Sequence, residues 1–264
     1  MIELKSETER EHMRAAGRIV AEVLDLLRRA VAPGLTTLEL DRLAEAEIRR
    51  RGGHPVFKGY QAYAAQPAYP ASVCVSVNEE VVHGIPGPRR LKRGDLVSLD
   101  LGASVAGYVG DAALSVFVEG PPSEEAERLL GVTRASLTAG IAAVRPGGHI
   151  GDIGAAVQRV VEAAGFSVIR DFVGHGVGRA MHEDPQVPNY GQEGRGPRIR
   201  PGMALAIEPM VSLGDWPVRV LGDGWTAVTR DGSLACHFEH SVFVNEDGVE
   251  ILTGLSETPS GEVK

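Results

Sequence analysis

The feature that most constrains the fold of this chain is a spacing that occurs twice. A Pro-Gly pair at Pro33 precedes a segment of helical periodicity that ends at Gly52, nineteen residues later. A second Pro-Gly pair at Pro146 precedes another such segment, which ends at Gly165, again nineteen residues later. Proline near the first turn and glycine after the last turn are typical helix boundaries. The repeat therefore predicts equivalent helices in two similar halves.

Downstream of each predicted helix, a glycine, a strand and an acidic residue follow in the same order. Asp100 and Glu208 each lie six residues after a glycine, at the end of an apolar run. A further strand in each half carries another acid, Asp111 in the first half and Glu239 in the second. This order indicates an ancient duplication with a pseudo-two-fold axis. Carboxylates at equivalent places are then expected to converge at that axis.

Capping signals and periodicity predict the elements of both halves. Ser6 and Thr36 each precede a glutamate by three residues, which is the pattern of a capping box. Helices are expected to begin near residues 7, 37, 123 and 150, and strands to cover 72–77, 95–102, 113–120, 203–211 and 237–244. Alternation of valine with serine and cysteine in 72–77 predicts a strand with one buried face. We expect a single α+β catalytic domain with similar halves, about 5–120 and 121–255, and a loose polar tail at 256–264.

Composition excludes several classes of protein. The 264 residues are 43% hydrophobic and 23% charged, as in ordinary globular domains. The apolar runs are too short for a membrane span, and the charged start "MIELKSETER" is unlike a signal peptide. A formal net charge of −8 argues against a DNA-binding protein. Cys74 and Cys236 are the only cysteines, which favours a reducing, cytoplasmic setting without a disulfide framework.

Four acids at strand ends need an explanation, because charged side chains are rarely buried unless they are paired or bind a metal. Any one of them alone is more simply a solvent-exposed or arginine-paired acid. Together, close carboxylates would raise one another's pKa, and divalent cations remove that conflict. Two metal ions bridged by four acids, with one histidine, would have five protein ligands. Such an oxygen-rich set suits manganese, iron, cobalt or zinc better than copper.

Three histidines lie in glycine-rich stretches. His175 and His182 lie in "DFVGHGVGRAMHEDP", and His83 lies in "VVHGIPG". Flanking glycines allow a close backbone approach to a metal centre, so His175 is the expected ligand, and His83 and His182 are expected in the same cavity. Each could instead be a surface or hydrogen-bonded structural histidine. Structural roles are expected for His12, His54 and His149, and supporting or outward-facing positions for His237 and His240.

Five stretches, taken in order, resemble the methionine aminopeptidases. They are "NEEVVHGIPG", "LDLGASVAGYVGD", "FVGHGVGRAMHEDP", "AIEPMV" and "DGWTAVTRDGSLACHFEH". The resemblance implies the pita-bread fold, an antiparallel sheet flanked by helix pairs about a pseudo-two-fold axis. It also implies removal of N-terminal methionine from nascent proteins, preferably before a small second residue. Only 26 positions separate His182 from Glu208, so the chain resembles the short, bacterial type I enzymes and lacks room for the helical insertion of type II.

The same resemblance implies roles for individual residues. It implies that two divalent metal ions are bound by Asp100, Asp111, His175, Glu208 and Glu239. Glu208 would also shuttle a proton, His182 would hydrogen-bond the developing oxyanion, and His83 would contact the scissile amide. These three are the expected catalytic residues, and both histidines would bind substrate.

The resemblance further implies an apolar pocket for the methionine side chain. Tyr69, Cys74 and Trp225 would line it, although without the resemblance they are ordinary core residues. The family often has an aromatic residue where this chain has Met181, and a tyrosine where it has Gln66. Met181 would also line the pocket and fill that space flexibly, as thioethers do.

Two other functions fit parts of the sequence. A prolidase or Xaa-Pro aminopeptidase shares the fold and metal set but usually carries a large N-terminal domain. A non-catalytic binding module would tend to lose ligands, whereas all five are present.

Sequence also bears on partners. Nothing in it demands more than a monomer. A basic run, either a solvated loop or a transient contact with ribosomal RNA, is formed by Arg89, Arg90, Lys92 and Arg93.

Overall fold

The computed structural model describes residues 2–255, and its helices begin at the predicted caps. They are α1 (Glu7–Ala30), α2 (Thr37–Arg50), α3 (Glu124–Ala142) and α4 (Ile150–Ala163). Ser6 and Thr36 form the expected capping boxes, and Ser123 caps α3 by accepting a hydrogen bond from Ala126 N–H. No helix within residues 2–255 is long and apolar enough to cross a membrane. The predicted tail at 256–264 lies outside the described residues.

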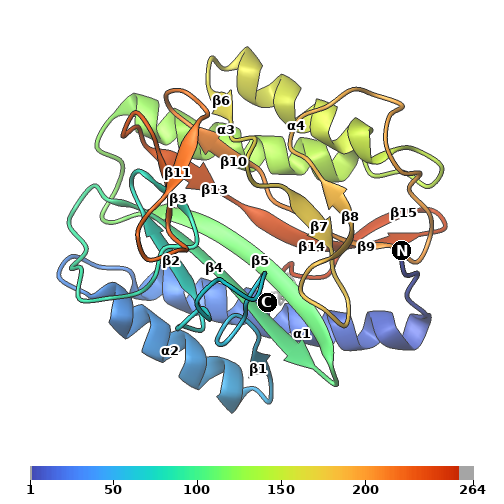
Figure 1. Cartoon of the computed structure of the whole chain (residues 1–264), viewed down its shortest axis with the longest axis horizontal. Helices are drawn as coiled ribbons and strands as arrows, with labels where there is room; N and C mark the ends of the chain where they lie inside the picture. Colours follow the sequence, from blue (N-terminus) through green and yellow to red (C-terminus); the bar gives the residue numbers. More distant parts are fainter. Residues whose placement is uncertain (1, 256–264) are drawn as a thin grey trace, which may run out of the picture.

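Within residues 2–255, fifteen strands form one large and two small antiparallel sheets. They are β1 (His54–Pro55), β2 (Cys74–Val77), β3 (Glu80–Val82), β4 (Leu96–Val105), β5 (Tyr108–Phe117), β6 (Ser167–Val168), β7 (Gly174–Gly176), β8 (Glu183–Val187), β9 (Ala204–Ile207), β10 (Met210–Ser212), β11 (Val218–Val220), β12 (Ala227–Thr229), β13 (Ala235–His237), β14 (Glu239–Asn245) and β15 (Gly248–Ile251). The large sheet has the order β1-β4-β5-β14-β9-β7-β8, with β2 also paired to β4 and β15 to β14. Figure 1 shows β5, β14 and β9 side by side across the middle of the molecule. The predicted α+β sheet with helix pairs is confirmed.

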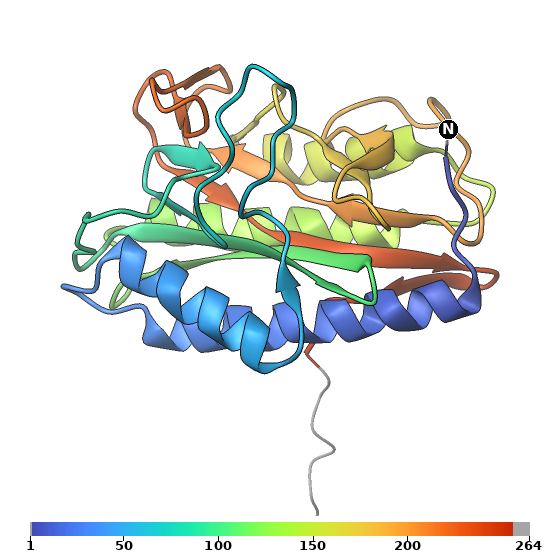
Figure 2. The ribbon, with the colours of Figure 1, turned by 60° about the horizontal axis from the view of Figure 1, so that its bottom comes forward.

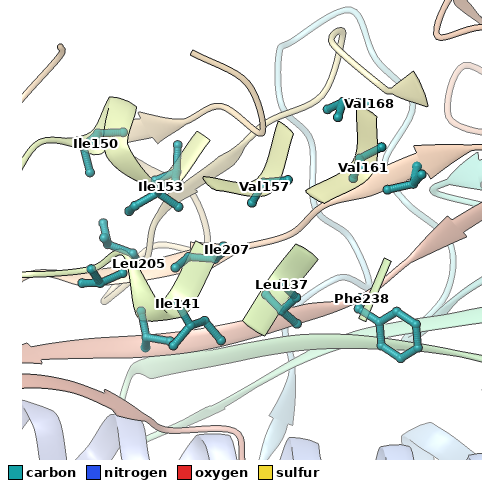
Figure 3. Packing of buried hydrophobic residues seen from close by; sticks show 14 of the residues in the cluster. Leu137, Ile141, Ile150, Ile153, Val157, Val161, Val168, Leu205, Ile207 and Phe238 are labelled. Carbon is teal, nitrogen blue, oxygen red and sulfur yellow. The ribbon is translucent and has the colours of Figure 1, made fainter. Parts of the chain in front are cut away.

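Both helix pairs cover the same face of the large sheet. In β4, Leu99 and Leu101 are fully buried against α1 and α2, which lie below the β4–β5 hairpin in Figure 2. In β9, Leu205 and Ile207 pack with the apolar residues of α3 and α4, as Figure 3 shows. Each fully buried side chain of this size contributes about 1.5–3 kcal/mol of transfer free energy. Since strand side chains alternate, the even-numbered residues of β4 and β9 lie on the other face.

Four predicted strands differ from the observed ones. The strand predicted over 113–120 begins five residues earlier, because β5 covers Tyr108–Phe117. The run 203–211 divides into β9 and β10 at Glu208, and the run 237–244 divides into β13 and β14 at Phe238. The prediction of a single buried face for 72–77 was wrong, because both faces are covered. Val75 packs against the helices, while Cys74 lies in a separate apolar cluster on the opposite face. Loops and the small sheets form a second layer there, visible above the large sheet in Figure 2.

Equivalent backbone hydrogen bonds recur in the two halves. Gly34 N–H donates to the carbonyl oxygen of Leu91 at 2.8 Å, and Gly147 N–H donates to that of Ile199 at 2.8 Å. These bonds join the turn before α2 to the segment before β4, and the turn before α4 to the segment before β9. The repeated spacing in the sequence therefore corresponds to repeated local contacts.

The turns that start β4 and β9 also match. Gly94 and Gly202 have φ of 85° and 88°, a left-handed conformation that favours glycine. Their N–H groups donate to Val118 and Val244 at 2.8 and 2.9 Å, at the ends of the partner strands. This pair of bonds sets the register of β4 on β5 and of β9 on β14 in the same way.

Asp41 of α2 fastens the segment that leads into β2. Its side chain is 8% exposed, and its Oδ1 accepts hydrogen bonds from Ser72 N–H at 2.7 Å and Val73 N–H at 3.3 Å. Burial raises the pKa of this carboxyl, although the two backbone donors oppose the shift. A neutral hydrogen-bond acceptor at this position should therefore stabilise the segment almost as much as a charged carboxylate.

We expect Asp41→Ala to lower the free energy of unfolding by about 2 kcal/mol, because two buried N–H groups lose their acceptor. Asp41→Asn keeps an acceptor and should recover most of that loss. Urea unfolding of both variants measures the difference. Equal stability of the alanine and asparagine variants would contradict this account of the contact.

Candidate metal centre and active site

The five expected ligands lie on five consecutive strands of the large sheet. Following the order β4-β5-β14-β9-β7, they are Asp100, Asp111, Glu239, Glu208 and His175, with Glu208 directly after the last residue of β9. Residues from both halves thus meet across the middle of the sheet. Their order along the sheet differs from their order in the chain, because β14 pairs between β5 and β9.

Strand register places all five side chains on one face. Gly102 pairs with Asp111, so Asp100, two residues earlier on β4, shares its face. Ala113, two residues after Asp111, pairs with Glu239. On the other side, Ala206 pairs with His175 and lies two residues before Glu208. These alternations select the face that the helices leave uncovered, above the sheet in Figure 2.

Potential ligand atoms lie close together on this face. One atom from each of Asp111, His175 and Glu239 falls within 4.8 Å of the others, and all three side chains are buried. His175 Nε2 is 3.4 Å from Glu208 Oε1. Buried oxygens without a hydrogen-bond partner include Asp100 Oδ1, Asp111 Oδ1 and Glu239 Oε1. Unpartnered buried carboxylate oxygens are costly, and a cation is the partner that such a donor set suits.

Burial and mutual repulsion perturb the ionisation of the whole cluster. Burial raises the pKa of Asp111 to about 7. Burial, together with the neighbouring carboxylates, raises the pKa of Asp100, Glu208 and Glu239 well above their ordinary values. Burial also lowers the pKa of His175 to about 3, so its imidazole is neutral at physiological pH and free to bind a metal.

The expectation that all four acids occupy equivalent places was wrong. The matching turns place Asp100 and Glu208 at corresponding positions of β4 and β9. The match of β5 with β14, however, makes His237 the counterpart of Asp111, and Ala113 the counterpart of Glu239. Glu239 is therefore shifted by two residues from the place of the first-half acid. A two-residue shift keeps the side chain on the same face, so the cluster still converges.

Glycines beside His175 have a different cause from the one expected. A Cβ on Gly174 would lie 2.3 Å from the carbonyl oxygen of Ala206, and one on Gly176 would lie 2.2 Å from that of Asp184. Both contacts are with the backbone of neighbouring strands. Close strand packing, and not approach to a metal, excludes side chains at these two positions.

A cavity of about 460 Å³ opens over the cluster. Every predicted site residue lines it: Tyr69, Cys74, His83, Asp100, Asp111, His175, Met181, His182, Glu208, Trp225 and Glu239. Gln66 lines it too, and its Nε2 donates to Gly224 O at 3.2 Å. The floor is acidic and the walls are mostly apolar, an arrangement that suits an apolar side chain beside a polar reacting group.

The apolar wall has its polar atoms satisfied by backbone. Tyr69 OH donates to Gly84 O at 2.9 Å, and Trp225 Nε1 donates to Pro67 O at 2.8 Å. Burial raises the pKa of Cys74 well above its ordinary value, so the thiol stays neutral. These side chains therefore present only apolar surface to the cavity. With Met181 and Phe57 they form one buried cluster.

His83 and His182 both line the cavity, and burial lowers the pKa of both imidazoles. His83 has φ of 61°, an uncommon conformation for a residue with a side chain. Burial lowers its pKa to about 4, so it is neutral. His182 is exposed, and its ring centroid lies 4.2 Å from that of His175.

Tyr60 is a cavity residue that the sequence did not reveal. Its hydroxyl lies 2.7 Å from His182 Nδ1. Phe57, Tyr63 and Phe172 also line the cavity. The only available signal was a density of aromatic residues in the irregular segment 57–69, which has no periodicity to assign them to a face.

Other histidines have mixed roles. His149 precedes α4, and its N–H donates to Asp152 Oδ2 at 2.8 Å. His12 stacks on Tyr108 at 5.6 Å, and His54 is exposed at the start of β1. His240 faces the helix side, where Nδ1 lies 2.9 Å from Thr253 Oγ1. His237 is buried, and its Nε2 has no hydrogen-bond partner among the described residues.

Comparison with known proteins gives consistent results at every level. Residues 11–246 match the model of metallopeptidase family M24. The methionine aminopeptidase of Clostridium acetobutylicum is 50% identical over 254 residues, which cover 96% of this chain and 99% of the relative. The crystal structure of methionine aminopeptidase from Thermotoga maritima superposes with a TM-score of 0.92 and 48% identity, over 97% of this chain and all of that one.

Proline-directed enzymes share the fold only. Prolidase from Pyrococcus furiosus superposes with a TM-score of 0.75 at 20% identity. The match covers 96% of this chain but 65% of the prolidase, which is therefore a longer protein.

Metal binding should strengthen as pH rises through the weakly acidic range. Raised carboxyl pKa values mean that a metal must displace protons there, whereas His175 is already neutral. If one proton is displaced, the apparent Kd for Mn²⁺ should fall about tenfold per pH unit between about pH 5.5 and about pH 7. Isothermal titration calorimetry of chelator-treated protein measures this slope.

The matched control for that measurement is Asp111→Asn, which removes one titrating carboxyl. This variant should bind more weakly and show a shallower dependence on pH. A Kd for the unaltered protein that does not change with pH would mean that the carboxyls are ionised before the metal arrives.

Proposed function

Because this chain belongs to the methionine aminopeptidases of metallopeptidase family M24, we propose that it removes the N-terminal methionine of nascent proteins with two divalent metal ions as cofactors. The observation on which this proposal depends is that five candidate ligand side chains line one cavity; four of them are buried, and Glu208 is partly exposed. Cobalt, manganese, iron and zinc all suit this oxygen-rich set with one imidazole. The ligands in this proposal are Asp100, Asp111, His175, Glu208 and Glu239.

When bound, the metal ions supply Lewis acidity that lowers the pKa of a water and polarises the scissile carbonyl. The unpartnered oxygens of the cluster support this assignment, since they leave coordination sites directed at no protein group. Four carboxylates from two halves also give enough negative charge to balance two divalent cations. Neutral His175 completes the set without adding positive charge.

Glu208 is the proposed proton shuttle. Burial and the nearby carboxylates raise its pKa, which makes it a stronger acceptor for a proton from water than an ordinary glutamate. It lies directly after β9, and its Oε1 is 3.4 Å from His175 Nε2, so it is placed between the ligands of β14 and β7. Both roles, ligand and shuttle, use one carboxyl group.

His182 is the proposed oxyanion donor. When the Tyr60 hydroxyl donates to Nδ1, the imidazole carries its proton on Nε2 and can donate to developing negative charge. A donor of this kind is worth about 2.7–4 kcal/mol in the transition state. His83, which lines the same cavity, is proposed to contact the scissile amide, and its strained backbone is consistent with a functional position.

The apolar wall is the proposed methionine pocket. Tyr69, Cys74, Met181 and Trp225 enclose it, and their polar atoms have backbone partners or are neutral. A linear thioether suits such surroundings, because it needs no hydrogen bond. Flexible Met181 adjusts the shape of the pocket. A small second residue in the substrate is part of the proposal.

We further propose a monomeric cytoplasmic enzyme whose two halves, about 5–120 and 121–255, form one catalytic domain. Both cysteines are buried and unpaired, which suits a reducing compartment. Transient ribosome contact is proposed through Arg89, Arg90, Lys92 and Arg93, which are all exposed, although Arg89 also pairs with Glu80 at 2.9 Å.

Glu208→Gln should lower kcat for Met-Ala-Ser by about 10²–10⁴-fold, the usual worth of a general acid–base group. The amide cannot carry a proton between water and the leaving amine. Metal content, measured on the same preparations, should remain close to that of the unaltered enzyme. Glu193→Gln, a change at an exposed residue paired with Arg159, is the matched control.

Substrate preference separates this function from that of the proline-directed relatives. Met-Ala-Ser should be cleaved, whereas Met-Pro and Ala-Pro peptides should be poor substrates, as judged by release of the first residue. Preferential cleavage before proline would favour a prolidase-like activity. A protein that binds no divalent metal and cleaves neither peptide would be a binding module.

A further inference from the structure

A buried ion pair joins the N-terminal arm, residues 2–6, to the loop that carries His182. This loop, residues 177–182, connects β7 to β8. Lys5 Nζ pairs with Glu183 Oε2, and the two side chains are 5% and 12% exposed. Figure 2 shows the arm running from the level of the second layer down to the start of α1.

Each partner of the pair is fastened to its own segment. Lys5 N–H donates to Gly202 O at 2.7 Å, and Lys5 Nζ also donates to Glu3 O at 3.1 Å. The second oxygen of Glu183, Oε1, accepts from Ala180 N–H at 3.1 Å. One carboxylate therefore connects the inside of the loop to a lysine that the large sheet holds in place.

Gly178 shows how closely the lysine approaches the loop. A Cβ at this position would lie 2.4 Å from Lys5 Cε and 2.6 Å from Glu183 Oε1. The atoms that this Cβ would meet belong to the ends of the Lys5 and Glu183 side chains, so a larger residue at position 178 would have to displace the ion pair. Gly178 therefore forms part of the surface against which the Lys5 side chain packs.

His182 contacts the rings of His175 and Tyr60, with centroid distances of 4.2 and 5.2 Å. Its described polar contact is the one between Nδ1 and the Tyr60 hydroxyl, and the ring is exposed. The loop contains no helix or strand, and residue 182 directly precedes Glu183. The position of the imidazole over the cavity consequently depends on how the loop is tethered.

We propose that Lys5 is a positioning residue, which holds the loop 177–182 through Glu183 and so sets the position of His182 over the cavity. The inference rests on the proposed role of His182 in the reaction. Lys5 is not among the residues that line the cavity, so it acts only through the loop. Removing one partner of a buried pair leaves an uncompensated charge, which should displace the loop.

A double-mutant cycle on the full-length, metal-loaded enzyme tests this role. Lys5→Met should lower kcat/KM for Met-Ala-Ser by about tenfold to a hundredfold, the cost of misplacing a catalytic group by about 1 Å. In the His182→Ala background the same substitution should cost less than about twofold, because the group that it positions is gone. Mn²⁺ affinity, measured by calorimetry, should be unchanged.

Arg14→Met is the matched control. It breaks the pair between Arg14 Nε and Glu250 Oε1 at 2.7 Å, which ties α1 to β15 and does not touch the loop. This substitution should change kcat/KM by the same small factor in both backgrounds. If Lys5→Met fails to fold, Glu183→Gln replaces it, since the amide keeps an acceptor for Ala180 N–H but loses the charge.

Several results would overturn the proposal. One is unaltered activity of Lys5→Met, and another is an equal loss in both backgrounds, which would indicate a general structural effect. A parallel loss of Mn²⁺ affinity would place the effect at the metal ligands. Failure of the proposed function looks different: His182→Ala would then cleave as fast as the unaltered enzyme, and no role would remain for Lys5 to support.

Discussion

The burial of four carboxyl groups on one face of a sheet is the constraint on which the rest of this structure depends. Their repulsion and desolvation disfavour the charged state, as the raised pKa values show. Such a cluster persists only where the surrounding fold is stable enough to hold it. Here the opposite face of the same strands supplies that stability, through two helix pairs packed on leucine, isoleucine and valine side chains. Along each of these strands, apolar residues that pack on the helices therefore alternate with residues that face the cavity.

Antiparallel strand pairing is what brings the ligand side chains together. The register between two paired strands places every second residue on the cavity face. Five neighbouring strands can therefore each contribute one ligand, four from within a strand and Glu208 from the position directly after β9. The register depends on the glycine turns before β4 and β9 and on the close strand contacts at Gly174 and Gly176. Substitution in these turns would move a whole row of side chains, and not one.

The upper layer differs from the sheet in how it is held. Its cavity walls come from irregular segments and small sheets, and His83 and His182 lie on loops. Individual polar contacts hold these segments. Asp41 of α2 holds the segment before β2, Tyr60 contacts His182, and Lys5 pairs with Glu183. Paired strands therefore hold the proposed metal ligands. Polar contacts between residues far apart in the sequence hold the loop groups that would face the substrate.

Sequence alone determined the helices, the repeated spacing, the family and eleven of the residues that line the cavity, because caps, periodicity and motif spacing are local properties of the chain. It failed where the answer depends on contacts between distant segments. Spacing could not show that His237, not Glu239, matches Asp111, since that match depends on strand pairing. Nor could it show that Gly178 lies against the ion pair of Lys5 with Glu183, because Lys5 is more than 170 positions away in the chain. Tertiary structure decided these points, because close packing acts between neighbours in space, whatever their distance along the chain.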